Sequence, residues 1–158
     1  MVYYGTELLM TGEEPKGHGF IRQDFPLGEW EPVVGGQQSA AERSDVPSEA
    51  RDLSQQLEAS QYLRTLLNWR KGSEVIHHGK LKQFIPQDGI YVYFRYDEED
   101  AVMVVINKNK ESRKLDLSRF REVLKDYRGG KDVVTGKVFL LEEGMEIPGA
   151  TAMVLELD

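Results

Sequence analysis

Residues 89–107 read GIYVYFRYDEEDAVMVVIN, and this stretch indicates the fold more strongly than any other part of the chain. Its two outer runs, 89–96 and 101–107, are rich in β-branched and aromatic residues, which are typical of β-strands. The four acids between them, residues 97–100, have the length and polarity of a hairpin loop. The stretch therefore predicts two antiparallel strands joined by an acidic loop.

Both faces of the first of these strands are apolar. Ile90, Val92 and Phe94 share one face by alternation, and Tyr91 and Tyr93 share the other. One face is therefore expected to form the core of a sheet domain, and the other is expected to pack on a helix. The tyrosine pair also leaves open a carbohydrate-binding β-sandwich, which would need both rings to face solvent.

The chain after residue 107 continues in the same way. Residues 131–134 (KDVV), 137–141 (KVFLL) and 151–157 (TAMVLEL) are further strand-like runs with short polar breaks between them. Residues 118–127 carry apolar side chains at helical spacing and predict a helical turn. Strands in succession with tight breaks imply antiparallel pairing. The predicted fold class is therefore mainly β, with an antiparallel β-sandwich from about residue 80 to residue 158.

One long helix is predicted before the sheet. Residues 51–72 (RDLSQQLEASQYLRTLLNWRKG) contain strong helix formers and no proline. The basic residues and the glycine at the end of this run suit a helix C-terminus. Its leucines fall close to one helical stripe. The sheet is expected to pack on residues 54–71 through Leu63, Leu66 and Leu67.

The first fifty residues have a different character. They hold four of the six prolines and show no sustained hydrophobic period. They predict the end of a strand at residues 2–4, followed by a long irregular segment. A lone strand leaves backbone N–H and C=O groups without partners. Self-association of copies through this N-terminal segment is therefore a further expectation.

Composition excludes several classes of function. The chain has 158 residues, is 40% hydrophobic and carries a net charge of −7, which suits one packed domain, or one small domain plus an appendage. The negative charge argues against a nucleic-acid partner and against an anionic membrane surface. No apolar run approaches the roughly 20 residues of a membrane span, and no targeting segment indicates a compartment. The lack of cysteine excludes disulfides and a cysteine nucleophile.

The polar motifs predict no metal site, no cofactor and no catalytic group. Residues 97–100 lack the alternating ligands and the central glycine of an EF-hand, so a solvated loop is the better interpretation. His77 and His78 are adjacent, and their side chains would diverge on a strand or on a helix. Residues 16–19 lack the strand–turn–helix context of a phosphate-binding loop, and no G-x-S-x-G pentapeptide occurs.

Four segments in order resemble the α-amylase family of glycoside hydrolases, in its neopullulanase and cyclomaltodextrinase branch. VYYGTELLMTG (2–12) is similar to the eighth strand of the catalytic barrel, and GHGFIRQDFPLGEW (17–30) is similar to the substrate-facing loop after it. Residues 55–84 resemble the last barrel helix and its exit. YVYFR, VMVVINKN, DVVTGK and the final AMVLELD resemble the C-terminal antiparallel β domain. The resemblance thus implies a remnant of the (β/α)₈ catalytic barrel at 1–78 and a C-terminal β domain at 79–158.

The same resemblance implies a parent enzyme that hydrolyses α-1,4 or α-1,6 bonds in α-glucans such as starch. Its catalytic carboxylates and calcium ligands would precede residue 1, so no catalytic residue is expected here. The family often carries Asp-x-x-x-Arg in the loop after strand eight. In this chain Arg22 matches that arginine, whereas His18 replaces the aspartate. Arg22 is therefore the expected sugar contact and His18 a weaker one, with Asp24 and Trp30 continuing the rim; Trp30 would either stack on a sugar or simply anchor the loop.

These implications set the expected function. The chain is expected to be a structural C-terminal fragment of an α-glucan-hydrolysing enzyme, inactive alone, whose parent binds α-glucan oligosaccharides. The alternative is a stand-alone β-sandwich module that binds carbohydrate or self-associates.

Overall fold

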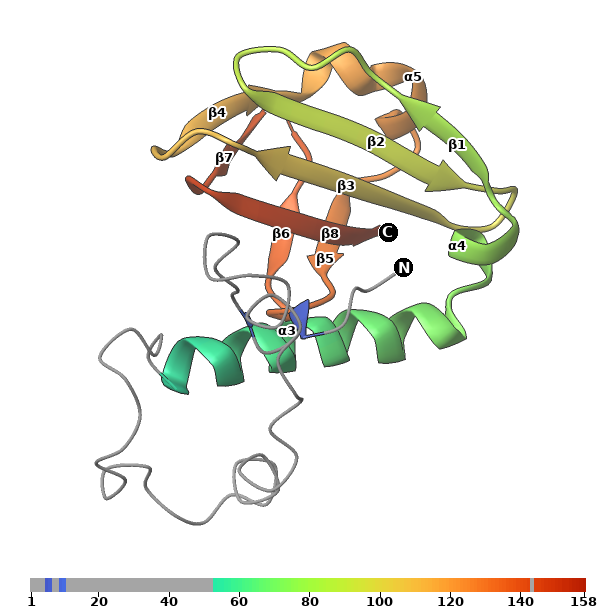
Figure 1. The fold of residues 1–158 in the computed structure, drawn as a ribbon. Coiled ribbons are helices and arrows are strands. Elements are labelled where there is room, and N and C mark those ends of the chain that lie inside the picture. Colours follow the sequence, from blue (N-terminus) through green and yellow to red (C-terminus); the bar gives the residue numbers. More distant parts are fainter. Residues whose placement is uncertain (1–4, 7–8, 11–52, 143) are drawn as a thin grey trace, which may run out of the picture. The chain divides into compact units, whose positions relative to one another are not determined.

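The computed structural model describes residues 5–6, 9–10, 53–142 and 144–158 (Figure 1). The chain divides into two compact units, Met1–Arg64 and Thr65–Asp158, and helix α3 (Leu53–Gly72) passes from the first into the second. The long helix predicted over residues 51–72 is thereby confirmed. The second unit holds every strand in the described part of the chain.

Two antiparallel sheets make up the second unit. The smaller sheet pairs β4 (Arg113–Asp116) with β7 (Gly144–Ile147). The larger sheet has six strands in the order β1 (Lys80–Gln83), β2 (Ile90–Tyr96), β3 (Ala101–Asn107), β8 (Thr151–Leu157), β5 (Gly129–Asp132) and β6 (Val138–Leu140). The predicted antiparallel β-sandwich is confirmed.

The hairpin that the opening stretch predicts is also confirmed. β2 and β3 pair antiparallel, with Ile90 opposite Asn107 and Tyr96 opposite Ala101. Figure 1 shows β2, β3 and β8 side by side, with α5 (Arg121–Leu124) over one face of the sheet. The 3₁₀ turn η4 (Leu117–Phe120) leads directly into α5. Together they fulfil the prediction of a helical turn within residues 118–127.

Several elements differ from the prediction. The strands β1, β4 and β7 and the short helix α4 (Glu74–His78) were not expected. The three strands read KLKQ, RKLD and GMEI, so they are too short and too polar to show a clear alternation. β5 is Gly129–Asp132, earlier than the predicted 131–134. It begins on two glycines, and a side chain on Gly130 would press against Leu155 and Leu157 of β8.

The main core lies on one face of the larger sheet. The second sheet, η4 and α5 cover this face, so the domain has two layers around one apolar interior. Its buried members from the larger sheet are Ile90, Val92, Phe94, Met103, Val105, Met153 and Leu155. Those from the covering layer are Leu115, Leu117, Phe120, Leu124, Met145 and Ile147, and Leu141, directly after β6, completes the set. One apolar face of β2 thus forms the core, as was predicted, and the structure shows that it is the face of Ile90, Val92 and Phe94.

No helix within the described ranges combines the length and the apolar character that crossing a membrane requires.

Candidate functional site

The residues predicted to contact sugar lie outside the described residues. Arg22, His18, Asp24 and Trp30 all fall within positions 11–52. The predicted strand at residues 2–4 and the self-association assigned to it also lie outside the described ranges. These assignments remain predictions. The side-chain contacts described next all belong to the second unit.

Two helices pack on the sheet of that unit. The last two turns of α3 and the short helix α4 pack on the face of β2, β3 and β8 that lies opposite the main core. We call this set of side chains the junction cluster: Leu66, Trp69, Val75, Ile76, Tyr93, Val102, Val104, Val133 and Val154. The second face of β2 thus packs on a helix, as its apolar pattern predicted.

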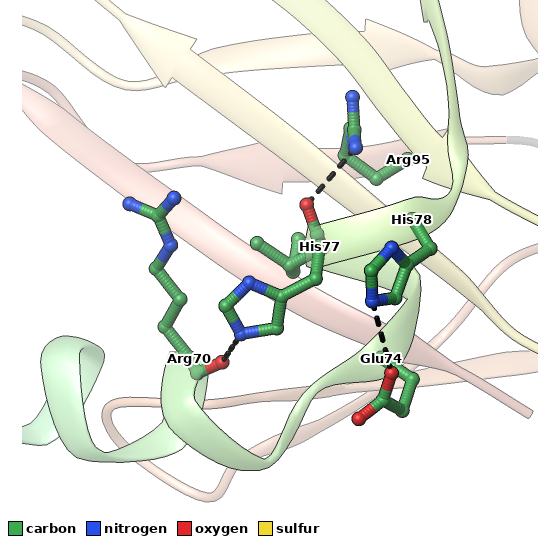
Figure 2. Close-up of polar contacts among 6 residues, drawn as sticks. Arg70, Glu74, His77, His78 and Arg95 are labelled. Carbon is green, nitrogen blue, oxygen red and sulfur yellow. Dashed lines mark hydrogen bonds and ion pairs between the residues drawn. The ribbon is translucent and has the colours of Figure 1, made fainter.

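Two polar contacts fix the junction cluster in place. The Trp69 indole Nε1 donates a hydrogen bond to Glu156 Oε1 of β8 at 2.6 Å. Arg95 of β2 donates from Nη2 to the carbonyl oxygen of Ile76 in α4 at 2.9 Å. Figure 2 shows the Arg95 side chain and marks this contact with a dashed line. Arg95 Nε is buried and has no hydrogen-bond partner among the described residues. These bonds tie each helix to a different strand.

Sequence reasoning missed Arg95, although a signal was present. Arg95 follows Tyr91 and Tyr93 at a spacing of two, which places all three on the helix-facing side of β2. A long cationic side chain at that position can reach the end of a helix that covers the sheet, and this is the signal that could have indicated the contact. The carbonyl group that it reaches belongs to α4, which the sequence did not predict.

The predicted contact residues on α3 need one correction. Leu66 packs in the junction cluster as expected, but the side chain of Leu67 is 42% exposed. Leu66 and Trp69 are three residues apart and share a helix face, whereas Leu67 lies about 100° further around the axis. The predicted leucine stripe was therefore too wide. Leu63 belongs to the first unit and is not a member of the cluster.

A matched pair of substitutions tests the junction. Leu66→Ala should lower the free energy of unfolding by about 1–2 kcal/mol, because it removes half-buried apolar surface from the junction cluster. Leu67→Ala should change it by less than about 0.5 kcal/mol, because that side chain is mostly in water. Urea denaturation followed by tryptophan fluorescence measures both. Equal losses for the two variants would contradict the assigned helix face.

The two adjacent histidines each have a partner of their own. His77 Nε2 lies 2.8 Å from the carbonyl oxygen of Arg70, and His78 Nε2 lies 3.5 Å from Glu74 Oε2 (Figure 2). The two ring centroids are 6.1 Å apart. Across the ranges that the structure describes, no three His, Cys, Asp or Glu side chains gather in a group suited to a metal ion. The histidine pair therefore serves the turn between α3 and α4.

The acidic residues at 97–100 form the hairpin loop that was predicted. All four are exposed, and Asp97 Oδ1 accepts hydrogen bonds from the backbone N–H groups of Glu99 and Asp100 at 2.9 and 2.8 Å. These two backbone bonds hold the pKa of Asp97 below its ordinary value. Asp97 thus closes the turn with its own side chain.

Both tyrosines of the pair on β2 contact other residues of the domain. The rings of Tyr91 and Tyr93 are 5.6 Å apart and tilted by 37°. Tyr93 packs in the junction cluster, and burial is the main cause that raises the pKa of its hydroxyl. Tyr91 donates its hydroxyl to Gln83 Oε1 at 2.8 Å. Because both rings are half-buried, the pair does not offer the open platform that a carbohydrate-binding sandwich needs.

The sequence and the fold are both similar to those of known proteins. Residues 81–156 match the family model of the cyclomaltodextrinase C-terminal domain. An α-amylase from Anoxybacillus is similar in structure over 98% of this chain and 28% of its own, with a TM-score of 0.63 and 16% identity. AmyP, solved with maltotriose, is similar over 70% of this chain and 22% of its own, with a TM-score of 0.55 and 17% identity.

A third structure has a different activity. The trehalulose synthase MutB from Pseudomonas mesoacidophila is similar over 63% of this chain and 18% of its own, with a TM-score of 0.52 and 13% identity. The chain spans less than a third of the length of each of these enzymes. At these identities the likeness concerns the fold. Together the matches show that residues 81–156 are similar to the cyclomaltodextrinase C-terminal domain, in a chain whose fold resembles part of an α-amylase.

Proposed function

We propose that this chain is the C-terminal part of an enzyme that hydrolyses α-glucans, of the neopullulanase or cyclomaltodextrinase type. The match of residues 81–156 to the cyclomaltodextrinase C-terminal domain carries this proposal. In the intact enzyme, residues 1–78 would complete the catalytic barrel and residues 79–158 would form the β domain. The parent would act on α-glucan oligosaccharides, for which Arg22, His18, Asp24 and Trp30 remain the proposed contacts.

The role proposed for the β domain is structural. By resemblance, α3 is the last helix of the barrel, and the junction cluster joins its final turns to the sheet. The Trp69–Glu156 and Arg95–Ile76 hydrogen bonds fix the orientation of the helices on the sheet, which apolar contact alone does not. A domain attached in this way would hold the end of the barrel's last helix in a fixed place. It would thereby stabilise the barrel without taking part in the reaction.

The substrate preference of the parent would be set outside the β domain. AmyP was solved with maltotriose, whereas the MutB protein of similar fold is a trehalulose synthase. One fold of this kind therefore accompanies enzymes with different reactions, in agreement with the general separation of fold from function. The proposal assigns linkage preference to residues upstream of the β domain.

The coding sequence immediately upstream of Met1 tests the parent enzyme directly. The proposal expects an open reading frame that continues upstream in frame and encodes a barrel with a catalytic aspartate and two further carboxylates. A stop codon and a ribosome-binding site directly upstream of Met1 would contradict it, because the chain would then be a product in its own right.

The chain alone is expected to hydrolyse no α-glucan. A retaining glycosidase needs two carboxyl groups about 5 Å apart on a rigid scaffold, and the proposal places them upstream. Purified chain should release no reducing ends from maltoheptaose, cyclodextrin or pullulan over a day, beside an α-amylase as positive control. Turnover that disappears in Asp24→Asn or Glu29→Gln, but persists in the matched variant Glu98→Gln of the hairpin loop, would place a catalytic site inside this chain.

A further inference from the structure

Positive charge is concentrated in one segment of an otherwise acidic chain. Residues 108–125 hold seven lysines and arginines against three acids, whereas the chain as a whole carries −7. This segment forms β4, η4 and α5, the layer that covers the main core. The proposed structural role of the domain does not require such a concentration of cations on this layer.

The same layer is hollowed. A groove of about 710 Å³ runs along β4, η4 and α5, and we call it the basic groove. Three cations line it: Lys114, Arg121 and Lys125. A second groove of about 520 Å³ lies next to it and shares Lys114 and Asp116 as a common wall. Both volumes fall within the range of about 300–1,000 Å³ that small-molecule sites occupy.

Two of the three cations in the basic groove are available to a ligand. Lys125 Nζ lies 3.8 Å from Asp126 Oδ2, but neither Lys114 nor Arg121 forms an ion pair with a residue in the described ranges. The neighbouring acid Glu122 already has a partner. Glu122 pairs with Lys82 Nζ at 2.6 Å. Lys114 and Arg121 are exposed, so their charged groups can reach an anion in the groove.

Asp116 is held in place at the wall of the basic groove. Its Oδ1 accepts the backbone N–H of Ser118 at 2.9 Å, which caps η4. The hydrogen bonds from Ser118 are the main cause that lowers the pKa of Asp116, and Lys114 adds to the effect. An ionised carboxylate with lone pairs left over is a good acceptor for ligand hydroxyl groups. Glu142, which also lines the groove, offers the same chemistry.

The rest of the lining is apolar. The buried side chains of Leu117, Leu124 and Leu141 form the floor, and the half-buried ring of Tyr127 joins them. Burial is the main cause that raises the pKa of the Tyr127 hydroxyl, followed by the negative charges of Asp100, Asp126 and Asp97. Three acids thus act on the Tyr127 hydroxyl. An anionic group is therefore better placed beside Lys114 and Arg121, which form no ion pair within the described ranges, than beside Tyr127.

We propose that the basic groove binds a phosphorylated sugar of mono- or disaccharide size. Arg121 and Lys114 hold the phosphate, the leucines and Tyr127 contact the C–H face of the ring, and Asp116 and Glu142 accept its hydroxyl groups. A neutral glucan would leave the two unpaired cations unused. A nucleic acid would meet the acids that act on Tyr127. The proposal rests on the groove alone and does not depend on the activity of the parent enzyme.

Amide chemical shifts of the ¹⁵N-labelled full chain test this proposal at low ionic strength. Glucose 6-phosphate should cause saturable shifts within residues 114–127, and inorganic phosphate or maltose should bind at least several-fold more weakly. Arg121→Ala and Lys114→Ala should each weaken glucose 6-phosphate binding by about tenfold, because a charge-assisted hydrogen bond is lost. Lys80→Ala, which removes an exposed cation from β1, should leave binding unchanged.

Each other result overturns the proposal or one of its parts. Binding that survives both Arg121→Ala and Lys114→Ala, or no saturable shift in that segment, would overturn the site. Equal affinity for inorganic phosphate would overturn the sugar contacts, and equal affinity for maltose would overturn the phosphate contacts. Both replaced side chains are exposed, and unchanged dispersion of the remaining amide signals verifies that each variant is folded.

Discussion

Replacing Phe120 with Ala is expected to lower the free energy of unfolding by about 3–5 kcal/mol. The side chain is only 1% exposed and packs against two other phenylalanine rings. Its ring is 4.8 Å from Phe84 at an interplanar angle of 88°, and 6.0 Å from Phe94 at 53°. The substitution removes both aromatic contacts and leaves a cavity where η4 meets the larger sheet.

Urea denaturation of the full chain, followed by far-UV circular dichroism, measures this loss. Phe120→Leu should cost clearly less than Phe120→Ala, because it keeps most of the buried volume. Leu140→Ala is the matched control: this β6 side chain is 68% exposed, and its loss should change the free energy by less than about 0.5 kcal/mol. Similar losses for Phe120→Ala and Leu140→Ala would contradict the position of the core.

The elements that were predicted correctly are those whose pattern is local and strong. Residues 90–96 and 101–107 are continuous runs of β-branched and aromatic residues, and the acids between them fit only a loop. The two apolar faces of β2 also indicated a sheet covered on both sides. Each of these properties depends on neighbours within a few positions, so the sequence alone was sufficient.

The elements that were missed form only when distant segments meet. β4 and β7 read RKLD and GMEI, and they are strands because they pair with each other across some thirty residues. β1 is defined by pairing with β2, with Leu81 opposite Arg95. The same reason applies to the functional features. The basic groove and the Arg95–Ile76 hydrogen bond each join residues from different elements. The spacing of apolar residues along the sequence does not indicate how those elements pack together.

Asn107, at the end of β3, is one of two buried polar side chains in the described part of the chain. It is 1% exposed, and its Nδ2 group donates toward the carbonyl oxygens of Glu111, Ile147 and Pro148 at 3.1, 3.2 and 2.9 Å. Its Oδ1 accepts from both the backbone N–H and the side-chain Nδ2 of Asn109 at 2.9 and 2.8 Å. One amide group therefore joins the turn after β3 to the turn before β8.

Replacing Asn107 with Ala is expected to lower the free energy of unfolding by about 2–4 kcal/mol. The change leaves several buried carbonyl groups and the Asn109 donors without a partner, and each such group costs about 1–3 kcal/mol when water does not reach it. Asn107→Asp should cost at least as much at neutral pH. It keeps the acceptor but turns a donor into a second anionic oxygen that faces three carbonyl groups.

The aspartate variant has a distinct dependence on pH. Burial and the facing carbonyl oxygens would raise the pKa of Asp at this position above its unfolded value, so the folded state would bind the proton more tightly. The deficit of Asn107→Asp relative to the unsubstituted chain should therefore shrink as the pH falls toward 4, whereas the deficit of Asn107→Ala should not. Asn68→Ala, on the exposed surface of α3, is the control and should cost little at any pH. Urea titrations at pH 7 and pH 5 measure all three variants. If the deficit of the aspartate variant stays constant across this interval, the Asn107 amide does not bridge the two turns in the way described.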